Sequence, residues 1–151
     1  MKTWITMALC AAAVTACTPT PETSAAPGAG EASVAQAGIE GVEWHLVELN
    51  GAAVTPGSRG APTLTFDAGE SRAAGFAGCN RYFAGYTRSG ATLRFADIGA
   101  TRMACTDDGA MELETNFLRA LEATESHAAS AGTLTLSGGG RTLARFTSTR
   151  T

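Results

Sequence analysis

Basic residues are few in this chain, and they form no cluster. Of its 11 Lys and Arg residues only Lys2 is a lysine, and the arginines are scattered along the sequence. The formal net charge is −3. Nucleic-acid binding usually needs a clustered basic face, so the composition argues against a nucleic-acid partner.

The sequence motifs of common enzyme classes are missing as well. There is no Gly-x-Ser-x-Gly elbow of a hydrolase and no Cys-x-x-Cys of a thiol redox protein. Ser58 lies in a turn-rich loop without a histidine partner, and Asp107 with Asp108 suits a helix start better than a catalytic pair. The side chains that could bind zinc lack zinc-ligand spacing; they are His45, Cys79, Cys105 and His127. We therefore expect no enzyme, no catalytic residue, no metal and no cofactor.

Hydrophobic runs long enough to cross a bilayer are absent too. The stretch from Trp4 to Val14 is about eleven residues, which suits the apolar region of an export signal, whereas a spanning helix needs roughly twenty. The segment Val14-Thr15-Ala16-Cys17 resembles the lipobox of bacterial lipoproteins, whose cysteine carries lipid and becomes the mature N-terminus. The alternative is ordinary cleavage after Ala16, with Cys17 unmodified.

Three segments follow from this pattern. We expect a lipoprotein signal peptide over residues 1–16, a lipid-anchored flexible linker over 17–41 and a folded domain over 42–151. The linker is rich in Pro, Ala and Gly and has no periodic apolar face, so it cannot bury a core. Thr18, rather than an aspartate, follows Cys17. By resemblance to lipoprotein sorting rules, this favours the periplasmic face of the outer membrane.

Alternation of apolar and polar residues predicts several short strands with one buried face. Their ranges are 44–49, 63–67, 72–76, 81–87, 92–95, 133–137 and 142–147. In the last range Leu143 and Phe146 are out of phase, which predicts a bulge or burial on both faces. Gly75, Gly78 and Gly85 indicate bulges or a close approach of two backbones.

One amphipathic helix is predicted over residues 110–123, from apolar residues at helical spacing. Asp107 or Asp108 is expected to cap its first N–H groups. His45 is expected on an exposed strand face and His127 in the loop after the helix. The order of strands, one helix and a final hairpin predicts a mainly β, α+β fold. It would be a small, strongly curved antiparallel sheet or barrel-like fold with one packed helix.

These features, taken in order, resemble those of a known family, the META domain, also called HslJ-like. The segments that carry the resemblance are Trp44-His45-Leu46, Leu64-Thr65-Phe66, Gly75 to Tyr82, Gly85-Tyr86, Leu93-Arg94-Phe95, Thr101-Arg102-Met103-Ala104-Cys105 and Glu114 with Leu118 and Leu121. The resemblance covers about residues 42–148. It implies a small, mainly β domain of barrel-like curvature, an envelope location, often a lipid anchor, and a link to heat-shock induction. It implies no enzymatic activity.

Cys79 and Cys105 are the two cysteines of the predicted domain, because Cys10 should leave with the signal peptide. In an oxidising compartment they are expected to form one disulfide. Closing a loop of about 26 residues would stabilise the domain by roughly 3–4 kcal/mol in the chain-entropy model. The alternatives are two buried free thiols and a redox switch.

The residues beside these cysteines are candidates for a partner-contact patch: Asn80, Arg81, Tyr82, Arg102 and Met103. A planar cation, an aromatic ring with a polar tip and a thioether suit a protein or glycan contact. The alternative is structural. In that case Asn80 would satisfy loop backbone groups, Tyr82 would pack in the core and Arg102 would pair with a carboxylate.

The sequence thus favours a non-enzymatic envelope lipoprotein. It would carry one META-like domain on a membrane tether and serve envelope integrity or stress tolerance through contacts with an unknown envelope protein. A small-ligand or inhibitor-type binding module is the alternative, and a hydrolase comes a distant third.

Lipidation of Cys17 is directly testable. Intact-mass analysis of the mature protein should show a diacylglyceryl-type adduct on an N-terminal Cys17. In a Cys17→Ser variant, the lipobox cysteine is gone and the adduct should be lost. A wild-type protein with an unmodified N-terminus would rule out the anchor.

Overall fold

The structure is a computed structural model that describes residues 38–148. The predicted signal peptide, Cys17 and the linker as far as residue 37 lie outside the described residues. Within 38–148, no helix is both long and apolar enough to cross a bilayer.

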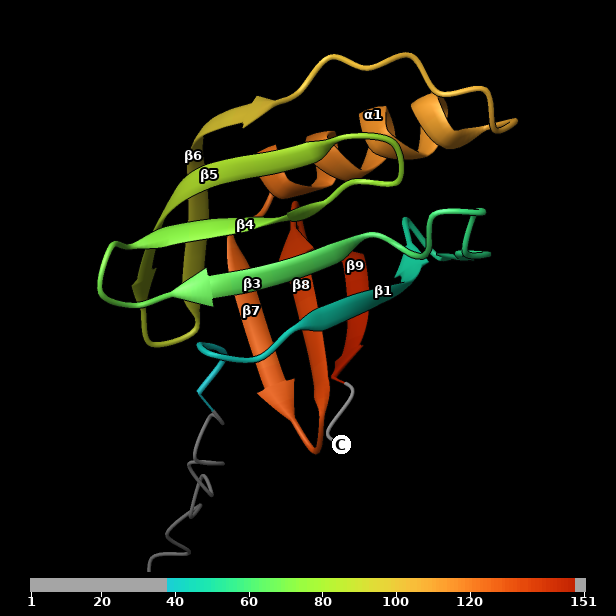
Figure 1. Cartoon of the computed structure of the whole chain (residues 1–151). Helices are drawn as coiled ribbons and strands as arrows, with labels where there is room; N and C mark the ends of the chain where they lie inside the picture. The colour runs from blue at the N-terminus through green and yellow to red at the C-terminus, as the bar shows by residue number, and fades with distance from the viewer. Residues whose placement is uncertain (1–37, 149–151) are drawn as a thin grey trace, which may run out of the picture. The chain divides into compact units, whose positions relative to one another are not determined.

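The described residues form one antiparallel sheet and a single helix (Figure 1). The elements are β1 (Trp44–Leu49), β2 (Ala52–Ala53), β3 (Thr63–Asp67), β4 (Arg72–Phe76), β5 (Arg81–Ser89), β6 (Thr92–Ala100), α1 (Ala110–Glu122), β7 (Ser126–Ser130), β8 (Thr133–Gly138) and β9 (Arg141–Ser148). The strand order is β2-β1-β3-β4-β5-β6-β7-β8-β9, and β1 also pairs with β9. The sheet therefore closes into a ring, and the predicted curved sheet with one packed helix is confirmed.

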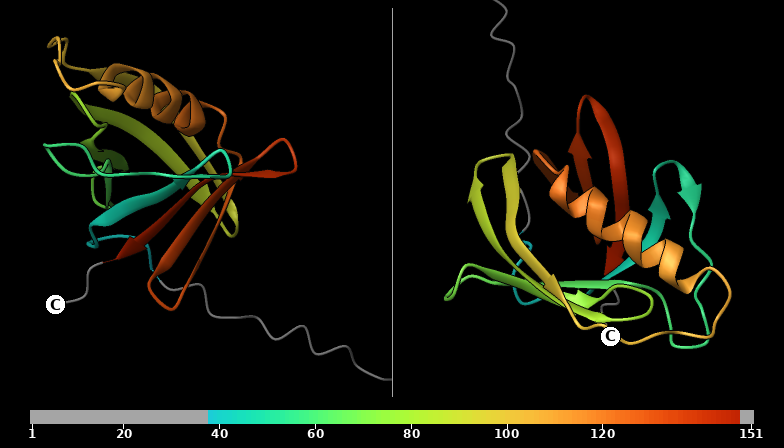
Figure 2. Two further views of the ribbon diagram at one scale, coloured as in Figure 1. Left: turned by 90° about the vertical axis from the view of Figure 1, so that its right-hand side faces the viewer. Right: turned by 90° about the horizontal axis from the view of Figure 1, so that it is seen from above.

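The ring is unevenly closed. β1 and β9 share a ladder that runs from Trp44 opposite Ser148 to Leu49 opposite Ala144. β6 and β7, by contrast, have a single partner pair, Thr92 opposite Ser126. Helix α1 connects these two strands in the chain and lies across one end of the ring (Figure 2).

Helix α1 packs its apolar face into the ring. Phe117 is fully buried, and its ring lies edge-on to Tyr82 at 5.5 Å and to Phe146 at 6.1 Å between centroids. Ala120 and Leu121 are buried beside it. Edge-to-face aromatic pairs of this kind add about 0.5–1.5 kcal/mol beyond the burial of their surface. The helix therefore fixes the end of the ring from which the loops around Cys79 and Cys105 project.

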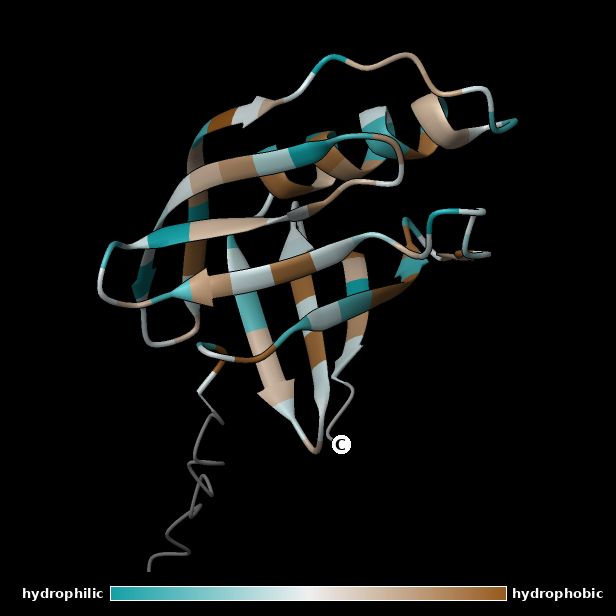
Figure 3. Ribbon diagram, viewed as in Figure 1, coloured by the Kyte–Doolittle hydropathy of each residue, from teal (hydrophilic) through white to brown (hydrophobic). Residues whose placement is uncertain are grey.

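Side chains fill the interior of the ring. Leu134 and Leu136 of β8 are fully buried, and Phe66 of β3 and Phe95 of β6 are 3% and 9% exposed. Apolar residues alternate with polar ones along these strands (Figure 3). These apolar side chains form the core of the ring, as in small barrels whose interior is filled by side chains.

Some irregularities in the ladders fall at residues where the sequence indicates them, whereas the register shift between Leu46 and Glu48 in β1 was not predicted. Leu136 faces Ala144 while Ser137 faces Thr142, so Leu143 is the extra residue of a bulge and is itself buried. At Gly75 a Cβ atom would overlap the carbonyl oxygen of Thr63. Two of the predicted features, the bulge in β9 and a close backbone approach at a glycine, are therefore confirmed.

Two predictions about the surroundings of α1 are wrong. Neither Asp107 nor Asp108 caps the helix, because Gly109 occupies the N-cap position with a left-handed φ of 77° and no side chain caps it. The Asp107 carboxylate instead accepts a hydrogen bond from the Ser58 hydroxyl. His127 does not lie in a loop, because residues 126–130 form β7 and His127 faces the interior, 3% exposed.

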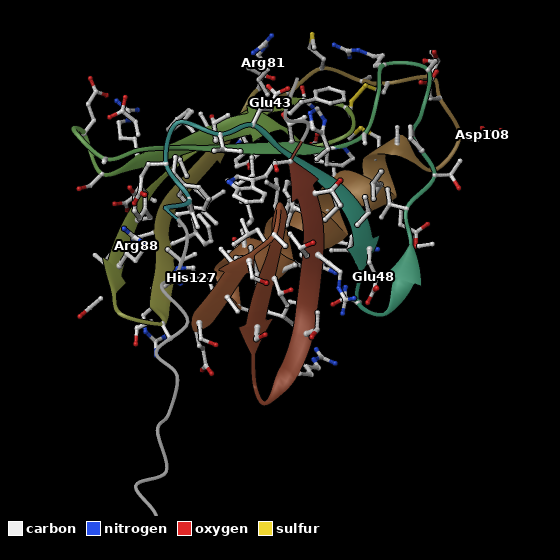
Figure 4. All side chains as sticks on the ribbon, turned by 90° about the horizontal axis from the view of Figure 1, so that it is seen from below. Glu43, Glu48, Arg81, Arg88, Asp108 and His127 are labelled. Carbon is white, nitrogen blue, oxygen red and sulfur yellow. A yellow bond between two sulfur atoms is a disulfide. The ribbon has the colours of Figure 1, made fainter. Side chains whose placement is uncertain are left out.

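Burial leaves His127 poorly placed to carry charge. Its Nδ1 lies 3.2 Å from the carbonyl oxygen of Ala91, and its Nε2 has no hydrogen-bond partner among the described residues. Desolvation lowers the pKa of His127, and the positive charge of Arg88 lowers it further. The hydrogen bond to the Ala91 backbone and the negative charge of Glu40 act in the opposite direction. Figure 4 shows Arg88 and His127 on the same side of the ring.

Stability should therefore depend on pH through His127. Unfolded histidine has a pKa of about 6.5. Below that pH, His127 is protonated in the unfolded chain. In the native state it stays neutral until the pH reaches its lower, native pKa. The free energy of unfolding should thus fall as pH decreases through this window. Urea denaturation at about pH 5 and 7.5 should show a smaller loss for His127→Leu than for wild type. An equal loss in His127→Leu and in the wild type would contradict this role.

Candidate functional site

A disulfide joins the two loops at the helix end of the ring. Cys79 lies between β4 and β5, Cys105 lies between β6 and α1, and their Cα atoms are 5.8 Å apart. The backbone of Thr101 also donates a 3.0 Å hydrogen bond to the carbonyl of Arg81. We call the segments 77–80 and 101–105 the clasp loops.

Asn80 organises the clasp loops from within. It is 1% exposed. Its Oδ1 accepts hydrogen bonds from the Met103 backbone N–H at 2.8 Å and from the Thr101 hydroxyl at 2.9 Å. Its Nδ2 donates to the Met103 carbonyl at 3.2 Å. One amide side chain thus satisfies the polar groups of the loop opposite.

Glu114 of α1 completes the same network. Its carboxylate, on a residue only 8% exposed, accepts the Asn80 backbone N–H at 2.6 Å and the Asn80 Nδ2 at 3.1 Å. Charge-assisted hydrogen bonds such as these offset part of the cost of burying a carboxylate. The helix, both clasp loops and the start of β5 are therefore tied together at one point.

Tyr82 is also a structural residue. It is 2% exposed, and its hydroxyl donates to the carbonyl of Thr63 at 3.0 Å. Burial raises the pKa of Tyr82 well above its ordinary value. Of the five predicted patch residues, Asn80 and Tyr82 therefore lie inside the molecule, where a partner cannot reach them, as the structural alternative expected.

The other three predicted residues lie on the surface and are joined there by a fourth. Arg81 and Arg102 are exposed, and among residues 38–148 neither forms an ion pair. Met103 is 48% exposed and Met111 of α1 is 46% exposed. Met103, Met111 and Arg102 line one shallow hollow of about 300 Å³. We call Arg81, Arg102, Met103 and Met111 the clasp surface.

The sequence contained a usable signal for Met111 and none for Arg59. On a helical wheel Met111 falls at the margin of the buried stripe, beyond Leu118, where exposure is expected. The Arg59 guanidinium donates to the Cys79 carbonyl at 2.9 Å and lies 5.3 Å from the centroid of the Phe76 ring. It links the loop after β2 to the clasp loops, a long-range contact that no local sequence pattern predicts.

Other candidate functional groups are few among the described residues. No group of three or more His, Cys, Asp or Glu side chains is placed to hold a metal ion within residues 38–148. His45 is partly exposed on β1, with its Nε2 3.2 Å from Glu43. A larger hollow, of about 470 Å³, opens between the β1–β2 hairpin and the start of α1.

Comparison with known proteins gives a family and a fold. The META domain model matches residues 37–150. A protein from Burkholderia xenovorans, solved by NMR, is 29% identical with a TM-score of 0.59, over 74% of this chain and 85% of that one. A second NMR structure, 24% identical with a TM-score of 0.58 over 72% of this chain and 91% of that one, shows the fold alone. No curated protein matches the chain.

The Asn80 network can be tested by truncation. Asn80→Ala should lower the free energy of unfolding by about 2–4 kcal/mol, because the Met103 backbone N–H and carbonyl and the Oε1 atom of Glu114 lose their partner. Urea denaturation of the disulfide-bonded protein would measure the loss. The neighbouring variant Arg81→Ala, on the surface, should change stability by no more than about 0.5 kcal/mol. Equal free energies of unfolding for the two variants would show that the Asn80 side chain does not stabilise the fold.

Proposed function

Because this chain belongs to the META domain family, we propose that it is a non-enzymatic lipoprotein of the cell envelope that works by binding another envelope protein. In this proposal Cys17 anchors the chain to the periplasmic face of the outer membrane, and the domain serves envelope integrity or stress tolerance. Because Ile39 is already buried in the domain, the tether comprises residues 18–37. As a flexible coil of about 20 residues it would span roughly 25 Å, enough to hold the domain off the bilayer.

The observation that carries the proposal is the exposure of two methionines beside an arginine on a rigid base. Met103 and Met111 leave nearly half of their surface in solvent, at 48% and 46%. Methionine and arginine are enriched in protein interfaces, and the flexible thioether adapts to irregular partner surfaces. The disulfide and the Asn80–Glu114 network fix the backbone of the loop that carries Arg102 and Met103, so little backbone ordering cost remains on binding.

A small-ligand or inhibitor-type module is the second candidate. The packed interior of the ring gives it no support, but the hollow of about 470 Å³ beside α1 does. Its volume falls within the range of about 300–1,000 Å³ that is usual for ligand pockets. A hydrolase has no comparable support, since the Ser58 hydroxyl is bonded to Asp107 in place of a histidine.

Site-specific crosslinking in the native envelope tests the clasp surface. A photoactivatable residue at Met103 or Met111 of the full-length lipoprotein should give one discrete crosslinked product. The same residue at Val47, which is 37% exposed on β1, is the matched control and should not. Arg81→Gln with Arg102→Gln should reduce that product about 10-fold, the effect of losing about 1.4 kcal/mol of binding free energy.

Thermal unfolding of the double variant separates the outcomes. An unchanged melting temperature with a lost product supports a contact site. A large fall in melting temperature supports a structural role for the arginines. Equal products from Val47 and Met103, or none from either methionine, would overturn the proposal.

A further inference from the structure

The hollow beside α1 is a groove with an apolar floor. It runs between the β1–β2 hairpin and the first turns of the helix, and its floor is formed by Leu49, Val54 and Leu113. Leu49 is buried, whereas Val54 and Leu113 pack against the edge of the core. The groove shares no residue with the hollow under the clasp surface. Figure 4 likewise shows Arg81 and Asp108 well apart, with Asp108 on the side of the β1–β2 hairpin.

One wall of the groove is an unpaired strand edge. Among residues 38–148, β2 pairs with β1 alone and ends the strand order. The Val54 N–H donates to the Val47 carbonyl at 2.9 Å, and Glu48 faces Ala53 as the next pair along the ladder. In an antiparallel ladder, bonded and non-bonded pairs alternate, so the N–H and C=O of Ala53 point outward. Ala53 is exposed and lines the groove.

The opposite wall is acidic. Asp107 and Asp108 both line the groove, and no Lys, Arg or His does. The Ser58 hydroxyl holds the Asp107 carboxylate in place, while Asp108 is exposed. An apolar floor between a free strand edge and two carboxylates is complementary to an extended chain that carries a positive charge.

We propose that this groove binds an extended peptide segment of a partner protein by adding it as a strand to β2. Backbone hydrogen bonds to Ala53 would hold the segment, as in other cases of strand addition. Side chains two residues apart share one face of a strand. The preferred segment therefore has an apolar residue over Val54 and Leu113, with a Lys or Arg two positions away that reaches Asp107 and Asp108. The site is independent of the clasp surface, and either can fail without the other.

The probe is a pool of six-residue peptides, acetylated and amidated to remove terminal charges. Each has Leu and Lys two positions apart within Ser and Thr, and a second pool has Glu in place of Lys. The mature lipidated protein is held in uncharged phosphatidylcholine nanodiscs, and binding is followed by NMR or calorimetry. We expect the Lys pool to bind with a Kd below about 1 mM, to weaken with added salt, and to outcompete the Glu pool.

Three variants test the three parts of the groove. Asp107→Asn with Asp108→Asn should weaken binding at least about 5-fold, and Asp108→Asn alone, which leaves the Ser58 bond intact, should weaken it less. Ala53→Pro removes an outward N–H without breaking the hairpin ladder and should abolish strand addition at an unchanged melting temperature. Glu112→Gln, an exposed acid of the same helix outside the groove, is the matched control and should bind as wild type.

Several results would overturn the proposal. One is no binding by any member of the Lys pool at about 1 mM. Another is equal binding to wild type and the Asp107/Asp108 double variant. A third is that hexylammonium binds as tightly as the peptides and is unaffected by Ala53→Pro, which would make the groove a site for small apolar amines instead.

Discussion

The arrangement of the clasp loops and the clasp surface depends on the buried side-chain amide of Asn80. Its side chain bonds the loop that carries Met103, and its backbone and side chain both bond Glu114 of the helix. The disulfide next to it holds the same loops covalently. A buried network of this kind is stable only when every member is satisfied. It therefore fixes the two clasp loops relative to each other and to the helix, so that they form a defined base for the exposed side chains.

The fold was predictable wherever alternation was strong. Strands β1, β3 and β4 have the predicted bounds, because large apolar residues alternate with polar ones or glycines mark their limits. Strand β7 was missed because Ser126–Ser130 offers only His127 and small residues, with no branched or large apolar side chain to mark a strand. The helix cap was also missed, since the left-handed Gly109 takes the N-cap position that a side-chain cap usually fills.

The site was predictable only in part. The segments around the two cysteines do come together, and Arg81, Arg102 and Met103 are exposed there. Which polar side chains turn inward was not decided by local sequence, because Asn80 and Tyr82 are buried by partners supplied from distant segments. The groove beside α1 has no local signal at all, as its walls come from three parts of the chain that meet only in the folded ring.

The junction between β6 and β7 has one partner pair, flanked by hydrogen bonds from the Leu93 N–H to the Glu125 carbonyl and from the His127 N–H to the Ala91 carbonyl. If this short junction opened, the ring would become an open sheet in which β6 and β7 each have an unpaired edge. Open edges of this kind pair readily with a second chain. Opening of this one junction, without melting of the rest of the sheet, would thus be enough to let two molecules exchange strands or begin to aggregate.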